Sequence, residues 1–335
     1  MSQQLESFRE AVAFVGGAIE ATQEGGLQVI LGDGHHDVGL LTAGAVFPRD
    51  AKMLVWSAMD IRSDGRVPVV VGEVVSEGAR KFLREQQVGY SDAGGSLFLP
   101  LKGAFVLVDK AAPKREKRVV KSVLSGKTSL AVHALMTGDR PLKGVDISQM
   151  TGLSLGGVSA ALDKLDRMGW LVTSSDGATK FRSIGDRRGL IEQWKLARLA
   201  EGPVRKERFY VPGVTGADAL ARKLSAVAAA EGIPYMVTGP YGAQVHAPYL
   251  SAISQVVGRI PEGDIERMAA ALGARKVNDG WNLGLVPSDI PASPPFLSEV
   301  DGLMIASPLL CWVDTVAEVG RARELADHLA SERIF

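Results

Sequence analysis

The pattern of apolar and polar positions is clearest in the middle of the chain. Apolar residues recur at helical spacing in three successive runs, residues 127–136, 146–152 and 154–168. Glycine or proline ends each run, and Ser154 is placed to cap the third helix. Residues 170–173 and 178–183 then flank a turn at residues 174–177 that ends in Asp-Gly, which predicts a β-hairpin.

This order is that of a winged helix-turn-helix, in which the amino end of the third helix enters the major groove of DNA. The outward positions there are small or apolar: Ser154, Leu155, Gly156, Gly157, Ser159 and Ala160. They allow the backbone to approach DNA but lack the Arg, Lys, Asn and Gln side chains that distinguish bases. The other candidate DNA-binding residues are Lys127, Lys143, Lys164, Thr179, Lys180 and Arg182. A winged helix used only for protein contacts is the alternative.

Charge favours DNA over protein as the partner of this segment. Residues 114–206 hold 18 Lys and Arg against 9 Asp and Glu. Residues 1–112 hold 10 against 14, and residues 207–335 hold 10 against 15. Because salt screens charge over about 8 Å, the basic middle keeps its own field and attracts phosphates. Its densest run, residues 114–121, is expected to be either a phosphate-binding arm or a solvated linker.

Length and composition limit the class of protein. A chain of 335 residues is expected to form two or three domains. No run is long and apolar enough to cross a membrane, and the polar, acidic start does not predict a secretory signal. Cys311 is the only cysteine, so we expect no disulfide, no cysteine-rich zinc site and a reducing, cytoplasmic location. The many Ala, Gly, Val and Arg residues favour a bacterial source.

The start of the chain is expected to form helix and strands. Residues 3–22 have the spacing of an amphipathic helix, and residues 27–31 and 53–57 are strand candidates. His35 and His36 fall in a Gly- and Asp-rich loop. A solvated turn is favoured over a metal site there, because four polar residues in one loop fix no coordination geometry.

Residues 67–108 contain a clearer unit. A buried-strand run over residues 67–72 precedes a helix over residues 77–86, capped by Ser76, and further strands begin at Val88. Strand, helix and strand at this length predict a right-handed crossover. Residues 25–110 are therefore expected to form an α/β domain with a mixed sheet.

This unit resembles the degenerate restriction-endonuclease-like domain of AbiEi-type antitoxins and related regulators. The matching residues are Ser76, Glu77, Ala79, Arg80, Leu83, Arg84, Glu85, Val88, Gly89, Tyr90, Asp92 and Gly94. An active nuclease of this kind holds a metal with two acids and a lysine. Asp92 and Lys102 are present but the second acid is missing, and hard cations need several oxygen ligands. The domain is expected to be non-catalytic.

After the basic middle, the pattern predicts a further α/β region. Residues 186–200 predict a helix in which Trp194 packs on a neighbouring domain, and Pro203 marks a boundary. Strands are expected at residues 209–211 and 235–237, with an Ala-rich helix between them.

The last third is similar to the C-terminal domain of the same family. The matching residues are Tyr235, Thr238, Gly239, Ala243, Ser307, Pro308, Asp314, Arg321, Glu324, Ala326 and Leu329. Leu310 or Cys311 stands where the family has a glutamine. The resemblance implies a nucleotidyltransferase fold, whose active form needs Gly-Ser before a helix and then Asp-x-Asp. Pro240 follows Gly239 here and no Asp-x-Asp follows before Pro261, so we expect no transfer, no cofactor, and a structural role for Asp314, such as pairing with Arg321.

These patterns together predict a multi-domain chain of α/β and α+β architecture. Its parts are a restriction-endonuclease-like domain at residues 1–112, a winged helix-turn-helix at residues 113–202 and a nucleotidyltransferase-like domain at residues 203–335, with no enzymatic activity. The expected function is sequence-specific binding of double-stranded promoter or operator DNA by a transcriptional regulator. The resemblance implies an autoregulating antitoxin and a nucleotidyltransferase toxin as partner, and winged helices often bind as homodimers.

Two alternative functions stay open at this point. The first is a metal-dependent nuclease that uses Asp92 and Lys102. The second is a plasmid replication or partition protein that binds DNA repeats, which the sequence does not separate from a regulator.

Overall fold

The structure is a computed structural model that describes residues 3–22, 25–110, 123–138 and 140–335. It is a mixed α/β architecture with several sheets. The chain divides into two compact units: residues 1–122 with 162–171, and residues 123–161 with 172–335. The basic run at residues 114–121 lies outside the described residues, as does the predicted domain border at residue 112.

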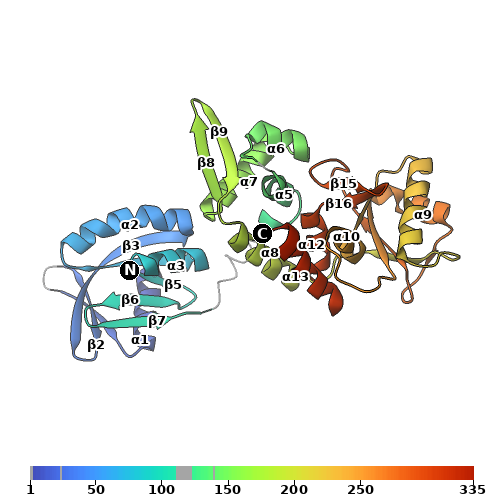
Figure 1. The fold of residues 1–335 in the computed structure, drawn as a ribbon. Helices are drawn as coiled ribbons and strands as arrows, with labels where there is room; N and C mark the ends of the chain where they lie inside the picture. Colours follow the sequence, from blue (N-terminus) through green and yellow to red (C-terminus); the bar gives the residue numbers. More distant parts are fainter. Residues whose placement is uncertain (1–2, 23–24, 111–122, 139) are drawn as a thin grey trace. The chain divides into compact units, whose positions relative to one another are not determined.

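In its described part, the first unit holds a seven-stranded sheet with helices on both faces (Figure 1). The helices are α1 (Gln3–Phe14), α2 (Pro48–Ser63) and α3 (Glu77–Glu85). The strands are β1 (Ala18–Ala21), β2 (Leu27–Leu31), β3 (Gly34–Val46), β4 (Val67–Val75), β5 (Gly89–Asp92), β6 (Leu97–Leu101) and β7 (Ala104–Val108). They lie in sequence order, with β4 parallel to both β3 and β5 and the other pairs antiparallel. The predicted mixed sheet is confirmed.

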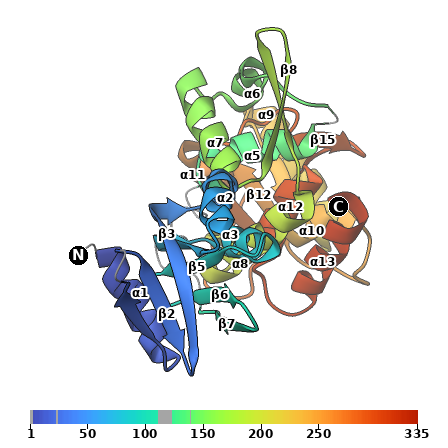
Figure 2. The same ribbon diagram turned by 90° about the vertical axis from the view of Figure 1, so that its left-hand side faces the viewer.

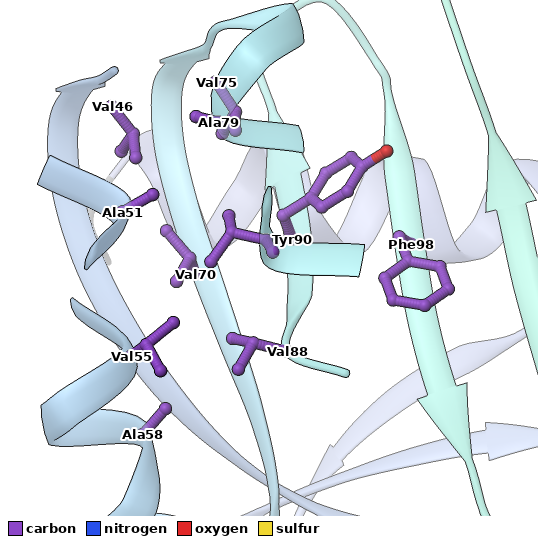
Figure 3. Packing of buried hydrophobic residues seen from close by; sticks show 11 residues of the cluster. Val46, Ala51, Val55, Ala58, Val70, Val75, Ala79, Val88, Tyr90 and Phe98 are labelled. Atoms are coloured by element: carbon purple, nitrogen blue, oxygen red, sulfur yellow. The ribbon is translucent and has the colours of Figure 1, made fainter. Parts of the chain in front are cut away.

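Strand β4 is buried along most of its length because both faces of the sheet are covered. Val70 belongs to a cluster with Val55 of α2 and Tyr90 of β5 (Figure 3). Val71, the next residue, belongs to a second cluster with Phe8 of α1. Successive residues of a strand face opposite sides, so the unbroken run of valines supplies both cores.

The helix predicted for residues 3–22 is too long. It ends at Phe14, and Ala18–Ala21 form strand β1, which pairs antiparallel with β2. Gly16 lies at the break with a φ of 80°, a left-handed conformation that no helical residue adopts. A Cβ on Gly17 would stand 2.8 Å from the carbonyl oxygen of Ile30, so a glycine is needed where the chain meets β2.

The strand predicted for residues 53–57 is wrong, because these residues lie in α2. Pro48 is in the first turn of α2, and Asp50 accepts a hydrogen bond from the amide of Phe47 at 3.0 Å, which fixes the helix start. Ala51, Val55 and Ala58 are the buried residues of α2. Their steps of four and three residues carry the helical period, which a window of five residues is too short to reveal.

His35 and His36 do not lie in a loop but at the start of β3. The turn is shorter, at Gly32 and Asp33, and His35 pairs with Ile30 of β2. The Nδ1 of His35 lies 3.0 Å from the Oε1 of Gln28. Among the described residues no group of three or more His, Cys, Asp or Glu side chains is placed to hold a metal ion.

The second unit contains the helix-turn-helix segment and the last third of the chain. The first of these comprises α5 (Thr128–Thr137), α6 (Gly144–Thr151), α7 (Leu155–Arg167), β8 (Leu171–Asp176), β9 (Thr179–Ile184) and α8 (Arg187–Glu201), and the second half of α7 with Leu171 is grouped with the first unit. All three predicted helices and the hairpin are present, with the turn at Gly177 and Ala178 rather than at residues 174–177. The hairpin extends well beyond α5 and α6 (Figures 1 and 2).

The last third forms a second sheet in the order β13-β10-β14-β12-β11-β16-β15. The strands are β10 (Glu207–Tyr210), β11 (Met236–Thr238), β12 (Val256–Ile260), β13 (Arg275–Lys276), β14 (Leu283–Pro287), β15 (Leu297–Val300) and β16 (Leu303–Ala306). The helices are α9 (Ala217–Glu231), α10 (Gly239–His246), the 3-10 turn η1 (Glu262–Asp264), α11 (Ile265–Leu272), α12 (Pro308–Thr315) and α13 (Arg321–Arg333). Helices α10, α12 and α13 pack together, and α9 with α11 lies on the other side of the sheet (Figure 1).

Helix α8 packs against the last third of the chain. The Trp194 ring of α8 meets the Trp312 ring of α12 edge to face, with centroids 6.3 Å apart. Lys195 of α8 forms a 2.5 Å ion pair with Asp327 of α13. Trp194 does pack on a distant segment of the chain, but that segment belongs to the same compact unit rather than to a separate domain, and the border predicted at residue 202 falls inside this unit.

Within the described residues, no helix combines the length and apolarity needed to cross a membrane. Cys311 is fully buried in α12, and burial raises the pKa of its thiol. A Cβ on Gly242 of α10 would stand 2.7 Å from the Sγ of Cys311, so a glycine allows these two helices to approach closely.

Candidate nucleic-acid interface

The turn between α6 and α7 is fixed by a set of local hydrogen bonds. Gly152 ends α6 with a φ of 70°, the left-handed cap predicted from the sequence. The hydroxyl of Ser148 donates to the carbonyl of Leu153 at 2.6 Å. The hydroxyl oxygen of Ser154 accepts from the amide of Gly157 at 3.1 Å, which confirms the predicted cap of α7. These bonds set the direction in which α7 leaves the turn.

The amino end of α7 presents a small, open surface. Leu155 is 61% exposed, and Gly156, Gly157, Ser159 and Ala160 are also exposed. A Cβ built on Gly156 would meet nothing within 4 Å. Val158 and Ala161 face inward and are buried, so the outward positions are those predicted. This end of the helix can approach a nucleic-acid backbone closely.

The β8–β9 hairpin, which follows α7 in the chain, carries two cations. Lys180 is exposed and Arg182 is half-buried, and within the described residues neither side chain forms an ion pair or hydrogen bond. The backbone of Arg182 exchanges two 2.8 Å hydrogen bonds with Leu142, which holds the base of the hairpin. Arg140, exposed and two residues before Leu142, adds a cation that the sequence pattern did not mark.

The other predicted residues are arranged less favourably. The Nζ of Lys143 lies 5.4 Å from the centre of the Phe181 ring, so this cation is held against β9. Thr179 begins β9 and is half-buried. Lys164 lies in the second half of α7 and is half-buried. Lys127 precedes α5, is 76% exposed and stands 3.9 Å from Asp289. The fold therefore places Lys127 beside an acidic side chain rather than on α7 or the hairpin.

Much of the basic charge after the hairpin is already neutralised. Lys195 pairs with Asp327, Arg198 pairs with Glu201, and Lys206 pairs with Glu318 at 2.6 Å. The first and third of these pairs join the basic middle to the acidic last third of the chain. The charge counts along the sequence had predicted that the basic middle keeps an electrostatic field of its own. Lys180 and Arg182 on the hairpin, with Arg140 near its base, remain unpaired as far as the described residues go.

The acid and lysine of the nuclease alternative are not brought together. Asp92 is 1% exposed and its Oδ2 lies 2.7 Å from the Nη2 of Arg80. Its Oδ1 accepts from the amides of Gly94 and Ser96 at 2.9 and 3.1 Å. Lys102 follows the far end of β6, six residues after Ser96 and thus about 20 Å along an extended strand. Asp92 is therefore a buried carboxylate in which both oxygens accept hydrogen bonds from the protein.

Asp314 is also structural, but its partner differs from the one suggested by sequence. It accepts from Arg259 through both oxygens, at 2.5 and 2.7 Å, and from the hydroxyl of Thr238 at 2.6 Å. The suggested pairing with Arg321 is wrong, because Arg321 is exposed on α13. Arg259 comes from β12, 55 residues before Asp314, so no local pattern marks the pair.

A buried histidine that no sequence motif marked joins α5 to α12. The Nε2 of His133 lies 2.8 Å from the hydroxyl of Ser307, the residue that caps α12. Burial lowers the pKa of His133 to about 3. The imidazole is therefore neutral, and it accepts the Ser307 proton while its other nitrogen donates to the carbonyl of Pro295. Both side chains are buried, and the contact positions α5 against α12.

Comparisons of the chain with protein-family models, with curated protein sequences and with solved structures found no match.

Proposed function

We propose that this chain binds double-stranded DNA as a transcriptional regulator, with α7 entering the major groove and the β8–β9 hairpin lying against the phosphate backbone. The observation that carries the proposal is the open amino end of α7, set by a hydrogen-bonded turn, together with Lys180 and Arg182 on the neighbouring hairpin. Small outward residues at this end permit close approach, and unpaired cations supply the salt-dependent attraction of phosphates.

The finer features of the proposal rest on the family resemblance. An AbiEi-type regulator would carry the restriction-endonuclease-like and nucleotidyltransferase-like folds without their activities, bind its own promoter as a homodimer and reside in the cytoplasm. The bonding of Asp92 supports a non-catalytic first domain, because its buried carboxylate is held by Arg80 and two amides, and one carboxylate is too few oxygen ligands for a hard cation. A nucleotidyltransferase toxin as partner belongs to this proposal too.

The test is a fluorescence anisotropy titration of the full chain with labelled duplex DNA. DNA from upstream of its own gene is compared with random duplex of equal length at two salt concentrations. We expect preferential binding to the upstream DNA that persists at the higher salt, since specific contacts add to the phosphate term. Equal, salt-labile binding to both duplexes would remove the regulator and leave a non-specific binder.

Variants of the hairpin measure the phosphate contacts. Lys180→Ala with Arg182→Ala should weaken binding to both duplexes and reduce the slope of log affinity against log salt by about 1 for each phosphate that is no longer neutralised. Lys102→Ala is the matched control, because Lys102 is an exposed lysine on a hairpin of the first unit. An effect of Lys102→Ala equal to that of the hairpin variants would contradict the proposed surface.

A charge placed on α7 tests the groove contact itself. Gly156→Glu has space for its side chain and puts an acid at the helix end, so the fold should tolerate it while DNA affinity falls more than about tenfold. Gly156→Gln is the neutral control of nearly equal size and should cost much less. Unchanged affinity in Gly156→Glu would show that α7 does not face DNA.

A further inference from the structure

A cavity of about 440 Å³ lies within the second unit, where the helix-turn-helix segment meets the last third of the chain. Its walls are the amino end of α5, the segment after α8, the loop after β14 and one face of α12. The volume is within the range of small-molecule sites, about 300–1,000 Å³. It is separate from the amino end of α7 and from the hairpin, none of whose residues line it.

The acids that line this cavity are mostly committed to partners. Asp314 accepts from Arg259 and Thr238, and Glu201 accepts from Arg198. Asp289 is the remaining acid, and it is 74% exposed at the mouth with Lys127 at 3.9 Å. The carboxylates therefore offer few free acceptors to a ligand inside the cavity.

The cavity has more hydrogen-bond donors than the acceptors around it can satisfy. Arg205 is exposed and makes no ion pair or hydrogen bond within the described residues. Among the described residues, the only charged partner of Lys127 is Asp289, at 3.9 Å. The Nη1 of Arg259 reaches only the hydroxyl of Ser288, at 3.4 Å. Three cations with unused N–H groups line the same cavity, and guanidinium groups bind carboxylate or phosphate through two parallel hydrogen bonds.

The rest of the lining is apolar. Leu130, Trp194, Phe296 and Leu310 contribute to it, and His133 at its base carries no charge because burial lowers its pKa to about 3. A wholly polar ion such as free phosphate would leave this part of the wall without contacts. A ligand with an anionic end and an apolar body would satisfy both halves.

We propose that this cavity binds a small amphipathic anion, with a carboxylate or phosphate held by Arg205, Lys127 and Arg259 and an apolar group against Trp194 and Phe296. Such a ligand contacts α5 and α12 at once, so it stabilises the packing of the helix-turn-helix on the last third of the chain. Binding of the ligand does not depend on the proposed function. Only its effect on DNA affinity rests on it.

Isothermal titration calorimetry of the full chain tests the site with three probes: phenyl phosphate, benzoate and benzyl alcohol. We expect one molecule of phenyl phosphate or benzoate to bind per chain, with benzyl alcohol binding at least tenfold more weakly. The stronger of the two anions identifies the headgroup. No heat from either anion at millimolar concentrations, or equal affinity for the neutral alcohol, would overturn the proposal.

Single variants connect binding to the cavity. Arg205→Ala and Lys127→Ala change exposed side chains, so they should fold normally, and each should weaken anion binding about tenfold. Arg275→Ala is the matched control, an exposed arginine of β13 in the same unit that does not line the cavity. Equal affinity in Arg205→Ala, Lys127→Ala and Arg275→Ala would assign the heat to adventitious binding and overturn the site.

The DNA titration is then repeated with and without the bound anion. A change in DNA affinity that disappears in Arg205→Ala establishes the coupling between the cavity and the helix-turn-helix. Failure of all DNA binding would overturn the proposed function and leave the calorimetric result standing. Failure of the calorimetry with normal DNA binding would overturn only the cavity.

Discussion

The two units each bury an arginine–aspartate pair, and the pairs differ in what surrounds them. Arg80 and Asp92 are enclosed in the first unit, with side chains 3% and 0% exposed. Arg80 also donates to the carbonyls of Val75 and Lys110, so each of its three side-chain nitrogens has an acceptor in the protein. Arg259 and Asp314 are 11% and 2% exposed, and Arg259 keeps donors directed to a cavity. The Arg80–Asp92 pair is therefore a purely structural contact, whereas the Arg259–Asp314 pair also lines a candidate ligand site.

This difference follows from the number of partners around each guanidinium. A buried charge is tolerated when every polar atom is bonded. The first pair meets this condition through the protein alone. In the second pair each nitrogen of Arg259 also has a partner, but the partner of Nη1 is the hydroxyl of Ser288 at 3.4 Å, and the remaining N–H groups depend on solvent or a ligand in the cavity. Removing one partner should therefore have different consequences in the two units.

The largest effect is expected for Asp92→Ala. It leaves the Arg80 guanidinium buried without its main counter-charge, so the free energy of unfolding of the first unit should fall by about 3–5 kcal/mol. Urea unfolding followed by circular dichroism measures this loss. Asp109→Ala is the control, because Asp109 contacts the same guanidinium at 3.0 Å but is 52% exposed, and it should cost below about 1 kcal/mol.

A smaller effect is expected for Asp314→Asn. Arg259 keeps a hydrogen-bond acceptor and can gain solvent through the cavity, so the free energy of unfolding should fall by about 2–3 kcal/mol. Added phenyl phosphate should restore more stability to Asp314→Asn than to the wild type, since the anion replaces the missing charge. Equal stabilisation of both proteins, measured by thermal melting, would contradict the idea that the Arg259–Asp314 pair is open to a ligand while the Arg80–Asp92 pair is not. Asp289→Asn, at the exposed mouth, is the control.

The next effect concerns pH. The folded-state pKa of His133 is lowered to about 3, so the unfolded state binds the proton first as pH falls below the ordinary value near 6.5. Its contribution to stability is complete above pH 6.5 and is lost towards pH 3, at up to about 1.4 kcal/mol per pH unit.

Urea unfolding at pH 7.5 and 5.5 should show this loss, and His133→Gln should reduce it by about 1 kcal/mol. Burial also lowers the pKa of His246, so His246→Gln is measured alongside to separate the two histidines. A wild type and a His133→Gln variant with the same pH dependence would mean that His133 is not held neutral. The contact between α5 and α12, beside Asp314, would then carry the positive charge of a protonated imidazole at the lower pH.

The smallest effect is expected for Lys195→Ala. Its ion pair with Asp327 is short but its two side chains are 29% and 51% exposed, so solvent and salt weaken it. The decrease in stability should be below about 0.5 kcal/mol and should vanish at high salt. A decrease comparable with that of Asp314→Asn would show that the packing of α8 on the last third of the chain depends on surface charge and not on the buried Arg259–Asp314 pair.

Sequence periodicity predicted most elements of the helix-turn-helix, because its signals are local. The left-handed Gly152, the cap at Ser154 and the apolar steps at Val158 and Ala161 act within a few residues of one another. The same reasoning was wrong for residues 53–57, where four apolar residues and a serine fit a strand or a helix equally well. It also missed β1, which exists only because β2 lies beside it.

The candidate DNA-binding residues could be selected from the sequence. Whether their side chains are exposed and unpaired could not be predicted from it. The sequence by itself determined the helix-turn-helix, the hairpin, the buried valines of β4 and the basic middle of the chain. Only the tertiary structure decided that Lys195 and Lys206 are neutralised, that Lys180 and Arg182 have no charged partner among the residues the structure describes, and that Lys127 lines a cavity. It also joined Arg259 to Asp314 and His133 to Ser307, which are 55 and 174 residues apart. Periodicity and capping are properties of neighbouring residues, whereas burial and charge pairing depend on groups that meet only after the chain has folded.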